Sequence, residues 1–380
     1  MNKRIVPFSS PDIIDADLEA VDAVIRSGWL AHGKYSKKFE DLFCEFTGAK
    51  YATTVSNCTT GLHLSCLSAG FKNGDEVIVP AQTHTATAHA VEFTGAKAIF
   101  SDVDPISGNM NIEEISKKIS SKTKGIIPVH MTGFPCSMDE IKKYCFEKKL
   151  VLIEDCAHAI GTKHNNIHVG NFGITGCFSF YPTKQITTGE GGMVISNDEG
   201  IIDNVRKLKA FGIDTPPELR TKPGVYDVKG LGNNYRMTDF QAALGVGQME
   251  RYDINLKARR NNAKLYCELL KNLDCLSYLD YSKENSYFLF QIIFDENINR
   301  DEVLMELKNS GIGVSIHYAT PVPLMSYYKN KYSYQDQDFP NAVRYGNQSI
   351  SLPIHSNLTE DDIKYVCTIL TNYLEKNNNE

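Results

Sequence analysis

From residue 51 onward, short apolar runs alternate with segments of helical length. Five apolar runs predict buried strands: YATTV (51–55), EVIVP (76–80), AKAIFSDV (96–103), GIIPV (125–129) and LVLIE (150–154). The segments between them predict helices over Thr60 to Ala69, Thr85 to Glu92, Ile112 to Ile119 and Met138 to Glu147. Continuous apolar strands separated by helices are typical of a mostly parallel sheet covered on both faces. The pattern therefore predicts an α/β fold.

The two ends of the chain follow other patterns. Amphipathic helices are predicted over Asp15 to Ser27, ending at Gly28, and over Ser36 to Thr47. A helix follows Val194, a polar excursion covers 212–230, and a long helix runs to about Asn272. The last part predicts strands at Ser286 to Phe294 and GVSIHY (313–318), and helices at Asp301 to Gly311 and Glu360 to Leu374. We expect a large domain over 1–250 and a smaller α+β domain over 251–380.

Composition narrows the class of protein. The 380 residues carry a net charge of −6 without a block of like charges, so a nucleic-acid partner is not expected. No apolar run approaches the length of a membrane span, and the N-terminus lacks the apolar core of a signal peptide. The ten cysteines form no CxxC pair and are read as reduced thiols, so we predict a cytoplasmic protein. Cys156 and His158 have no second pair at ligand spacing, so no metal site is expected.

The stretch CFSFYPTKQITTGEGGMV, 177–194, carries one lysine between an aromatic strand and a glycine-rich turn. Gly189, Gly191 and Gly192 permit backbone conformations that a side chain would forbid. A lysine at a strand end becomes a nucleophile toward an aldehyde when partial burial lowers its pKa. Pyridoxal phosphate is the commonest biological aldehyde bound in this way, although a solvated loop lysine is the ordinary alternative for Lys184.

Other polar residues follow the predicted strands, where the ligand sites of parallel sheets lie. The segment Ser56 to Thr60 opens a helix and either binds a phosphate or only caps that helix. His84 follows EVIVP and is either a site residue or an ordinary loop histidine. Asp155 and His158 follow LVLIE, and Asp155 is either a functional acid or a structural cap.

Several of these blocks occur together in one order. SGWLAHG, SNCTTGLHL, VLIEDCAHAIGT, FSFYPTKQITTGEGGMV and NNYRMTDFQAALG resemble the DegT/DnrJ/StrS family of sugar-nucleotide aminotransferases, nearly from end to end. The resemblance implies fold type I of the pyridoxal phosphate enzymes, with a mostly parallel seven-stranded sheet and a small C-terminal domain. It implies pyridoxal 5′-phosphate as cofactor, with pyridoxamine phosphate as its alternate form, and a homodimer with a shared active site.

The resemblance also implies roles for single residues. Lys184 matches the Schiff-base lysine, and Asp155 matches the acid that pairs with the pyridine nitrogen. His158 matches a residue near the phenolic oxygen, and His84 matches the side chain that stacks on the ring. The phosphate is expected to be bound by Cys58, Thr59 and Ser179, and by Asn234 of the neighbouring subunit. The sugar site is expected to include His317, Tyr318, Tyr181 and Glu190.

The implied reaction moves an amino group from L-glutamate to a keto sugar linked to a nucleoside diphosphate. The amine of Lys184 would carry the proton in both halves of the reaction. The turn TTGEGGM resembles members that aminate C4 rather than C3. Two alternatives remain open: a dehydratase of the same family that uses pyridoxamine phosphate, and a non-catalytic sensor that binds the cofactor. Relatives recognised as 3-dehydratases have a histidine in place of the lysine, so Lys184 favours the aminotransferase.

Overall fold

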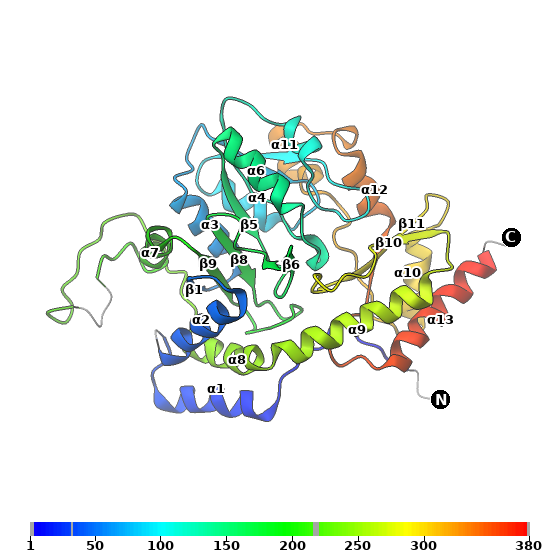
Figure 1. Ribbon diagram of the computed structural model, residues 1–380, viewed down its shortest axis with the longest axis horizontal. Coiled ribbons are helices and arrows are strands. Elements are labelled where there is room, and N and C mark those ends of the chain that lie inside the picture. The colour runs from blue at the N-terminus through cyan, green and yellow to red at the C-terminus, as the bar shows by residue number, and fades with distance from the viewer. Residues whose placement is uncertain (1–3, 32, 216–219, 378–380) are drawn as a thin grey trace.

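The structure is a computed structural model that describes residues 4–31, 33–215 and 220–377. Its centre is a seven-stranded sheet in the order β1 (Tyr51–Val55), β9 (Gly192–Ser196), β8 (Thr175–Ser179), β5 (Val151–Asp155), β4 (Thr123–Ile126), β2 (Glu76–Pro80), β3 (Lys97–Ser101). The pairs from β8 to β3 are parallel, and β9 runs antiparallel to both of its neighbours. The expected mostly parallel α/β sheet is confirmed (Figure 1).

Both faces of the sheet are covered, which explains why its strands are apolar at successive positions. Met193 and Ile195 of β9 pack in one core cluster, while Val194 packs in another on the opposite face. The first cluster includes side chains of α2 (Lys34–Thr47), α6 (Met138–Lys148) and α8 (Asp239–Glu250). The second includes side chains of α3 (Cys58–Ser68), α4 (Thr85–Glu92) and α7 (Glu199–Leu208).

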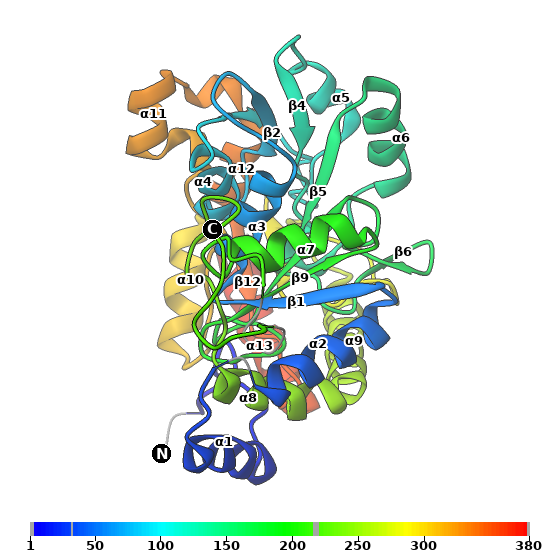
Figure 2. The same cartoon turned by 90° about the vertical axis from the view of Figure 1, so that its left-hand side faces the viewer.

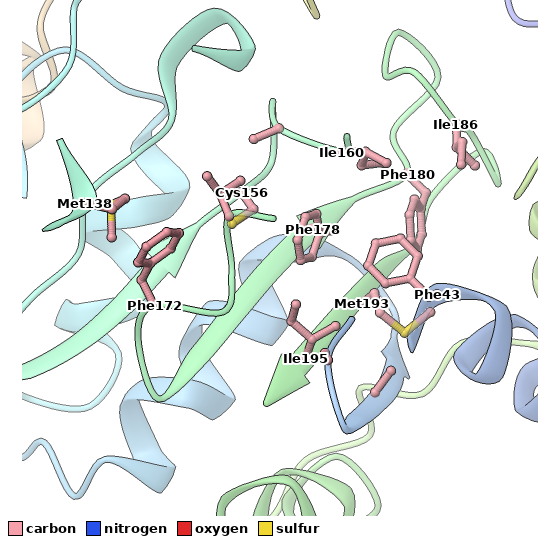
Figure 3. Packing of buried hydrophobic residues seen from close by; sticks show 14 of the residues in the cluster. Phe43, Met138, Cys156, Ile160, Phe172, Phe178, Phe180, Ile186, Met193 and Ile195 are labelled. Atoms are coloured by element: carbon pink, nitrogen blue, oxygen red, sulfur yellow. The ribbon is translucent and has the colours of Figure 1, made fainter. Parts of the chain in front are cut away.

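The strand that leads to Lys184 is anchored in the first cluster. Phe178 and Phe180 are fully buried and contact Phe43 of α2 with ring centroids 4.9 and 5.9 Å apart. Figure 3 shows these rings beside Met193 and Ile195 of the neighbouring strand. Because both ends of the segment 180–193 are held in this packing, the lysine between them has a defined position.

The C-terminal part forms a second layer with its own core. Its antiparallel sheet has the order β10 (Leu276–Tyr278), β11 (Phe290–Phe294), β12 (Ser349–Leu352). The helices α9 (Tyr252–Leu270), α10 (Arg300–Asn309) and α13 (Glu360–Asn377) contribute side chains to this core, and Val6 joins it from the other end of the chain. In Figure 1 this layer lies at one end of the molecule, with α9 leading into it from α8. The division at residue 250 stays a prediction.

The remaining elements are one helix of 13 residues, α1 (Asp15–Ser27), and a set of shorter helices, strands and turns. The shorter ones are α5 (Ile112–Ser116), α11 (Ser326–Tyr332), α12 (Pro340–Gln348), the hairpin β6 (Lys163–His164) and β7 (Ile167–His168), and 3-10 turns at Met131–Gly133, Val322–Leu324 and Asp336–Asp338. Tyr328 of α11 and Ala342 of α12 pack in the second core cluster, against the large sheet. The part of the chain after residue 250 therefore contacts both layers.

Several expected elements differ from the structure. The strand predicted at Ser286 to Phe294 covers only Phe290–Phe294, and the helix predicted at Ile112 to Ile119 ends at Ser116. The long helix is divided at Arg251, whose backbone (φ −111°, ψ 9°) is not helical and whose guanidinium binds Asp12 and Asp17. The expected strand at 313–318 is only a bridge between Ser315 and Ser351. Beyond it, the carbonyls of His317 and Tyr318 accept hydrogen bonds from the side chains of Gln291 and Gln82 instead of from a strand.

The described parts of the polar excursion predicted over 212–230 extend away from the body of the molecule in Figure 1 and lie in front of it in Figure 2, which is viewed from that side; residues 216–219 lie outside the described residues. Within the described part of the chain, every helix is too short or too polar to cross a membrane.

Candidate active site

Three strands of the large sheet bring candidate residues to the same edge. Asp155 is the last residue of β5 and pairs with Cys177 of β8, two residues before Ser179. His84 follows β2 and is the N-cap of α4, where its Nδ1 accepts a hydrogen bond from the Ala86 amide. Because parallel strands end on the same side, this edge is where a ligand site is expected.

Lys184 projects into this edge from the loop after β8. Its Nζ lies 4.1 Å from the centre of the Phe288 ring. Burial lowers the pKa of the amine to about 8, while the Cys58 thiol and the Asp155 carboxylate oppose part of that shift. A fraction of the amine is therefore neutral near neutral pH, which is what nucleophilic attack on a carbonyl requires.

Asp155 is buried, at 4% exposure, and lacks a cationic partner at salt-bridge distance among the described residues. Its Oδ2 accepts a hydrogen bond from the Thr87 hydroxyl at 2.8 Å, and its Oδ1 accepts one from the Ala157 amide at 3.0 Å. Burial raises the pKa of the carboxyl group, and these hydrogen bonds together with the Lys184 charge oppose that shift. The arrangement suits a cationic ligand atom beside Asp155.

His158 lies within the same group. Its ring packs against Phe288 with centroids 4.4 Å apart, and its Nε2 lies 3.3 Å from the Tyr318 hydroxyl. Burial and the nearby Lys184 charge lower the pKa of the imidazole well below its usual value, so the ring is neutral. Its Nδ1 is buried without a hydrogen-bond partner among the described residues.

The N-terminus of α3 forms another wall. The Asn57 side chain accepts a hydrogen bond from the Thr60 amide at 2.9 Å. Among the described residues, no acceptor is bonded to the amides of Cys58 and Thr59, which the first helical turn leaves without partners. A side chain at Gly192 would place its Cβ 2.8 Å from the Cys58 amide nitrogen, so glycine is required for this close approach. Gly192 also pairs with Ser179, which brings that serine to the same place.

At the two other positions of the turn, Gly189 and Gly191, glycine is required for different reasons. Gly189 has a positive φ of 77°, which glycine adopts without strain. A Cβ on Gly191 would lie 2.1 Å from the Thr188 hydroxyl oxygen and 2.7 Å from Met237. The turn is therefore tight because of packing at Gly191 and Gly192 and because of backbone conformation at Gly189.

The candidates for the sugar site divide into two pairs. His317 is close enough to Lys184 that the charge of the amine, after burial, contributes to lowering the pKa of this histidine to about 4. Its Nδ1 lies 3.0 Å from the Ser351 hydroxyl, and Tyr318 lies 5.8 Å from the His84 ring. Tyr181 and Glu190, by contrast, are exposed on the loop at either side of the lysine.

Asn234 is exposed, and its side-chain oxygen accepts a hydrogen bond from Arg236 at 2.8 Å. The next residue, Tyr235, accepts a hydrogen bond from the Ser56 amide, directly before the α3 N-terminus. None of the hydrogen bonds of Asn234 within the described chain reaches Lys184. Its expected role in a neighbouring subunit stays a prediction.

The neighbour of Asp155 in β5 belongs to a different network. Glu154 accepts hydrogen bonds from the amides of Gly170, Phe172 and Gly173 at 2.7 to 2.8 Å, and His130 lies 3.1 Å away. Cys156 completes a group of three potential metal ligands with Glu154 and His130. Because the Glu154 carboxylate already has four partners, this group is explained as a structural network.

Sequence reasoning missed Thr87 and Phe288, which contact Asp155 and Lys184. Thr87 lies on the expected helix after His84, where a turn spacing could have indicated a side chain facing the same edge. Phe288 lies in a different layer, and no pattern in SYFLF connects it to the lysine.

The DegT/DnrJ/EryC1/StrS aminotransferase family model matches residues 11–371. The chain belongs to this family. It is 36% identical to a GDP-perosamine synthase of Vibrio cholerae over 375 residues, which cover 97% of this chain and 99% of that protein. The fold is similar to the pyridoxamine phosphate form of a putative sugar aminotransferase of Streptococcus pneumoniae, with a TM-score of 0.92 and 26% identity over 98% of this chain and 99% of that one.

A third similar protein is PseC of Helicobacter pylori, an aminotransferase involved in pseudoaminic acid biosynthesis. It has a TM-score of 0.90 and 26% identity over 98% of this chain and all of that one. As a member of the DegT/DnrJ/EryC1/StrS family, this chain is a pyridoxal phosphate-dependent sugar aminotransferase. The expectations for family, fold class, enzyme class and cofactor are confirmed.

The geometry of this edge fits the cofactor of the family. The unpartnered amides of Cys58 and Thr59 suit its phosphate, Asp155 suits its pyridinium nitrogen, and Lys184 suits its aldehyde. The orphan Nδ1 of His158 requires a partner that the described protein does not supply.

Proposed function

We propose that the enzyme transfers an amino group from L-glutamate to C4 of a keto sugar linked to a nucleoside diphosphate. The observation that carries the proposal is the amine of Lys184, whose pKa burial lowers to about 8 at a strand edge that also holds Asp155. When bound, pyridoxal phosphate supplies an electron sink for the carbon that loses its proton. The buried surroundings of Lys184 increase the share of the neutral amine, which is the form that accepts that proton.

The other residues of the edge bind and orient. Asp155 keeps the ring nitrogen charged, because an adjacent carboxylate stabilises a cation in a buried place. Cys58, Thr59 and Ser179 hold the phosphate, so that the cofactor stays bound when the lysine amine is released. His84 contacts the ring. His317, Tyr318, Tyr181 and Glu190 are proposed to contact the sugar.

Support for the acceptor comes from two sources. The Vibrio cholerae relative is named for a GDP-linked amino sugar, which favours a nucleotide-linked acceptor here. The turn TTGEGGM after Lys184 favours C4 over C3 by its resemblance to C4 enzymes. The reaction type is supported separately, because a lysine at 184 favours amination over dehydration. The predicted cytoplasmic location agrees with a nucleotide sugar as substrate, because nucleotide sugars are available there.

We also propose that two copies share each active site through Asn234. Apolar side chains are exposed on α1, at Leu18 and Ile25. They are also exposed in and directly after the excursion over 212–230, at Val225, Tyr226 and Leu231. Exposed apolar groups of this kind are typical of surfaces that bind another protein. Val225, Tyr226 and Leu231 precede Asn234 closely in the sequence, which suits contact of this segment with a second copy of this chain.

A complementation experiment tests the sharing. Lys184→Ala and Asn234→Asp proteins, the second with a charge that repels phosphate, are each expected to be inactive. After the two are unfolded and refolded together, mixed dimers should regain activity because one site has both native residues. Absence of any regained activity, with mixed dimers shown by mass spectrometry, would contradict the shared site.

The acceptor is tested with enzyme first converted to its pyridoxamine form by L-glutamate. Keto sugars linked to GDP, UDP or dTDP are added one at a time, and each product is examined by NMR. An amino group on C4 of one nucleotide sugar is the expected result. Amination at C3, or loss of a hydroxyl group without amination, would contradict the proposed reaction.

A further inference from the structure

Tyr318 lies within hydrogen-bond distance of His158, where its hydroxyl can set the tautomer of that histidine. Its hydroxyl is 3.3 Å from His158 Nε2, and the described chain offers this hydroxyl no other hydrogen-bond partner. His158 is 3% exposed and packs against Phe288. Its Nδ1 is buried without a partner among the described residues, and a buried polar atom of this kind requires an explanation.

The protonation states decide which nitrogen of His158 carries hydrogen. Burial lowers the pKa of His158 well below its usual value, so the neutral ring has a single N–H. Burial raises the pKa of Tyr318, so its hydroxyl keeps its hydrogen. If Tyr318 only accepted from Nε2, its own hydrogen would lack an acceptor in the described chain. Donation from Tyr318 to Nε2 satisfies that hydrogen and places the ring hydrogen on Nδ1.

The backbone of Tyr318 is held in place by two amide side chains. Gln82 donates from Nε2 to the Tyr318 carbonyl at 2.9 Å, and Gln291 donates to the His317 carbonyl at 3.3 Å. These bonds join Tyr318 to the end of β2 and to β11, which belong to the two layers. The hydroxyl therefore has a fixed position relative to His158.

We propose that Tyr318 is a positioning residue: its hydroxyl holds His158 with hydrogen on Nδ1, so that Nδ1 donates to the phenolic oxygen of bound pyridoxal phosphate. The link to the cofactor rests on the proposed placement of the cofactor beside Lys184, whereas the tautomer is a property of the protein alone. A donor at the phenolic oxygen stabilises its ionised form. The pair Tyr318 and His158 would thereby favour the less protonated form of the cofactor.

The tautomer can be measured without cofactor. Protein labelled with ¹⁵N-histidine is examined by NMR, and His158→Gln identifies the signals of this residue. We expect hydrogen on Nδ1 in the wild-type protein, and on Nε2 or on both nitrogens in part after Tyr318→Phe. Tyr328→Phe, which removes a buried hydroxyl outside this group, should leave the His158 signals unchanged. Hydrogen on Nε2 in the wild-type protein would overturn the proposal.

The proposed hydrogen bond from His158 Nδ1 to the cofactor is tested separately, by recording the visible absorbance of the bound cofactor as pH is varied. After Tyr318→Phe the midpoint of the colour change should rise by about one pH unit, as expected when an ordinary hydrogen bond to the less protonated form is lost. In a His158→Gln background the same substitution should give no further shift, because an amide has no tautomer to control.

An unchanged midpoint in Tyr318→Phe, with the Nδ1 tautomer confirmed in the wild type, would overturn the link to the phenolic oxygen. If the protein binds no pyridoxal phosphate, the proposed function fails instead. The NMR measurement then still decides whether Tyr318 positions His158, so the two failures are distinguishable.

Discussion

Glu154 and Asp155 are adjacent buried acids at the end of the same strand, yet their surroundings differ. Glu154 has three backbone amides and His130 around its carboxylate. Asp155 has one hydroxyl and one amide, and it faces the edge where Lys184 lies. The alternation of side chains along a strand separates the two acids by face. Glu154, whose carboxylate has its hydrogen-bond partners within the protein, therefore supports the fold. Asp155, whose carboxylate can accept further hydrogen bonds, is available to a ligand.

The same contrast extends to the groups around each acid. The Glu154 network fixes the chain at 170–173, and those amides are satisfied within the protein. Around Asp155, the described protein leaves the Nδ1 of His158 and the amides of Cys58 and Thr59 without partners. Unsatisfied buried groups cost free energy, so their concentration at one edge points to a bound group that satisfies them.

The largest effect is expected from Lys184→Ala. Turnover should fall by at least about 10³-fold, because proton transfer by a positioned base is lost together with the covalent attachment. Cofactor should still bind through its phosphate contacts, which absorbance after gel filtration would show. Lys122→Ala, at an exposed lysine, serves as the control. Normal turnover in Lys184→Ala would refute the role of this residue.

Asp155→Asn should lower the rate by about 100-fold, equivalent to about 3 kcal/mol, because the amide cannot stabilise a charged pyridine nitrogen. The free energy of unfolding of the cofactor-free protein should change by less than about 1.5 kcal/mol, since an amide oxygen can keep one of the two hydrogen bonds. Steady-state kinetics and urea unfolding measure the two quantities. A variant with the wild-type rate would show that Asp155 is only structural.

Glu154→Gln should give the opposite result. The free energy of unfolding should fall by about 2 to 4 kcal/mol, because one oxygen becomes an NH₂ group that faces buried donors. Activity per folded molecule should stay within about threefold of the wild type. Glu147→Gln, at an exposed acid, should change stability by less than about 0.5 kcal/mol. A stable but inactive Glu154→Gln protein would contradict the assignment of Glu154 to stability and Asp155 to activity.

The last effect, which needs no substitution, is a pH dependence. Burial lowers the pKa of Lys184 from 10.5 to about 8, so the neutral, reactive amine increases as pH rises toward that value. The rate at which cofactor-free protein forms the yellow complex should rise about tenfold per pH unit below this pKa and level off above it. Stopped-flow absorbance measures the rate. A rise that continues toward pH 10.5 would show an ordinary, solvated lysine.

Periodicity predicted five of the seven strands of the large sheet because each is apolar and bounded by turn residues, as in EVIVP and LVLIE, and the aromatic run before Lys184 predicted β8, but β9 was not predicted as a strand. It could not predict that β9 runs antiparallel between β1 and β8, since the direction depends on which strands become neighbours. The strand expected at 313–318 failed because Gln82 and Gln291 take up its carbonyl groups. These partners are distant in sequence.

The site was predictable to the extent that its residues follow strands or match a family pattern. Lys184, Asp155, His158 and Cys58 were named from the sequence, and the structure brings them to one edge. The alternation within LVLIED separates Glu154 from Asp155, but only the packing of 170–173 reveals which acid is satisfied. Phe288 and the hydroxyl of Tyr318 reach the site from the second half of the chain, so sequence spacing holds no signal for their contacts.

The most direct test is the visible absorbance spectrum of protein reconstituted with pyridoxal phosphate, recorded before and after L-glutamate is added. We predict a yellow complex that bleaches to the pyridoxamine form in the wild-type protein, and no such complex in Lys184→Ala. A protein that binds no pyridoxal phosphate, or a Lys184→Ala protein with the same yellow complex and the same bleaching, would contradict the account.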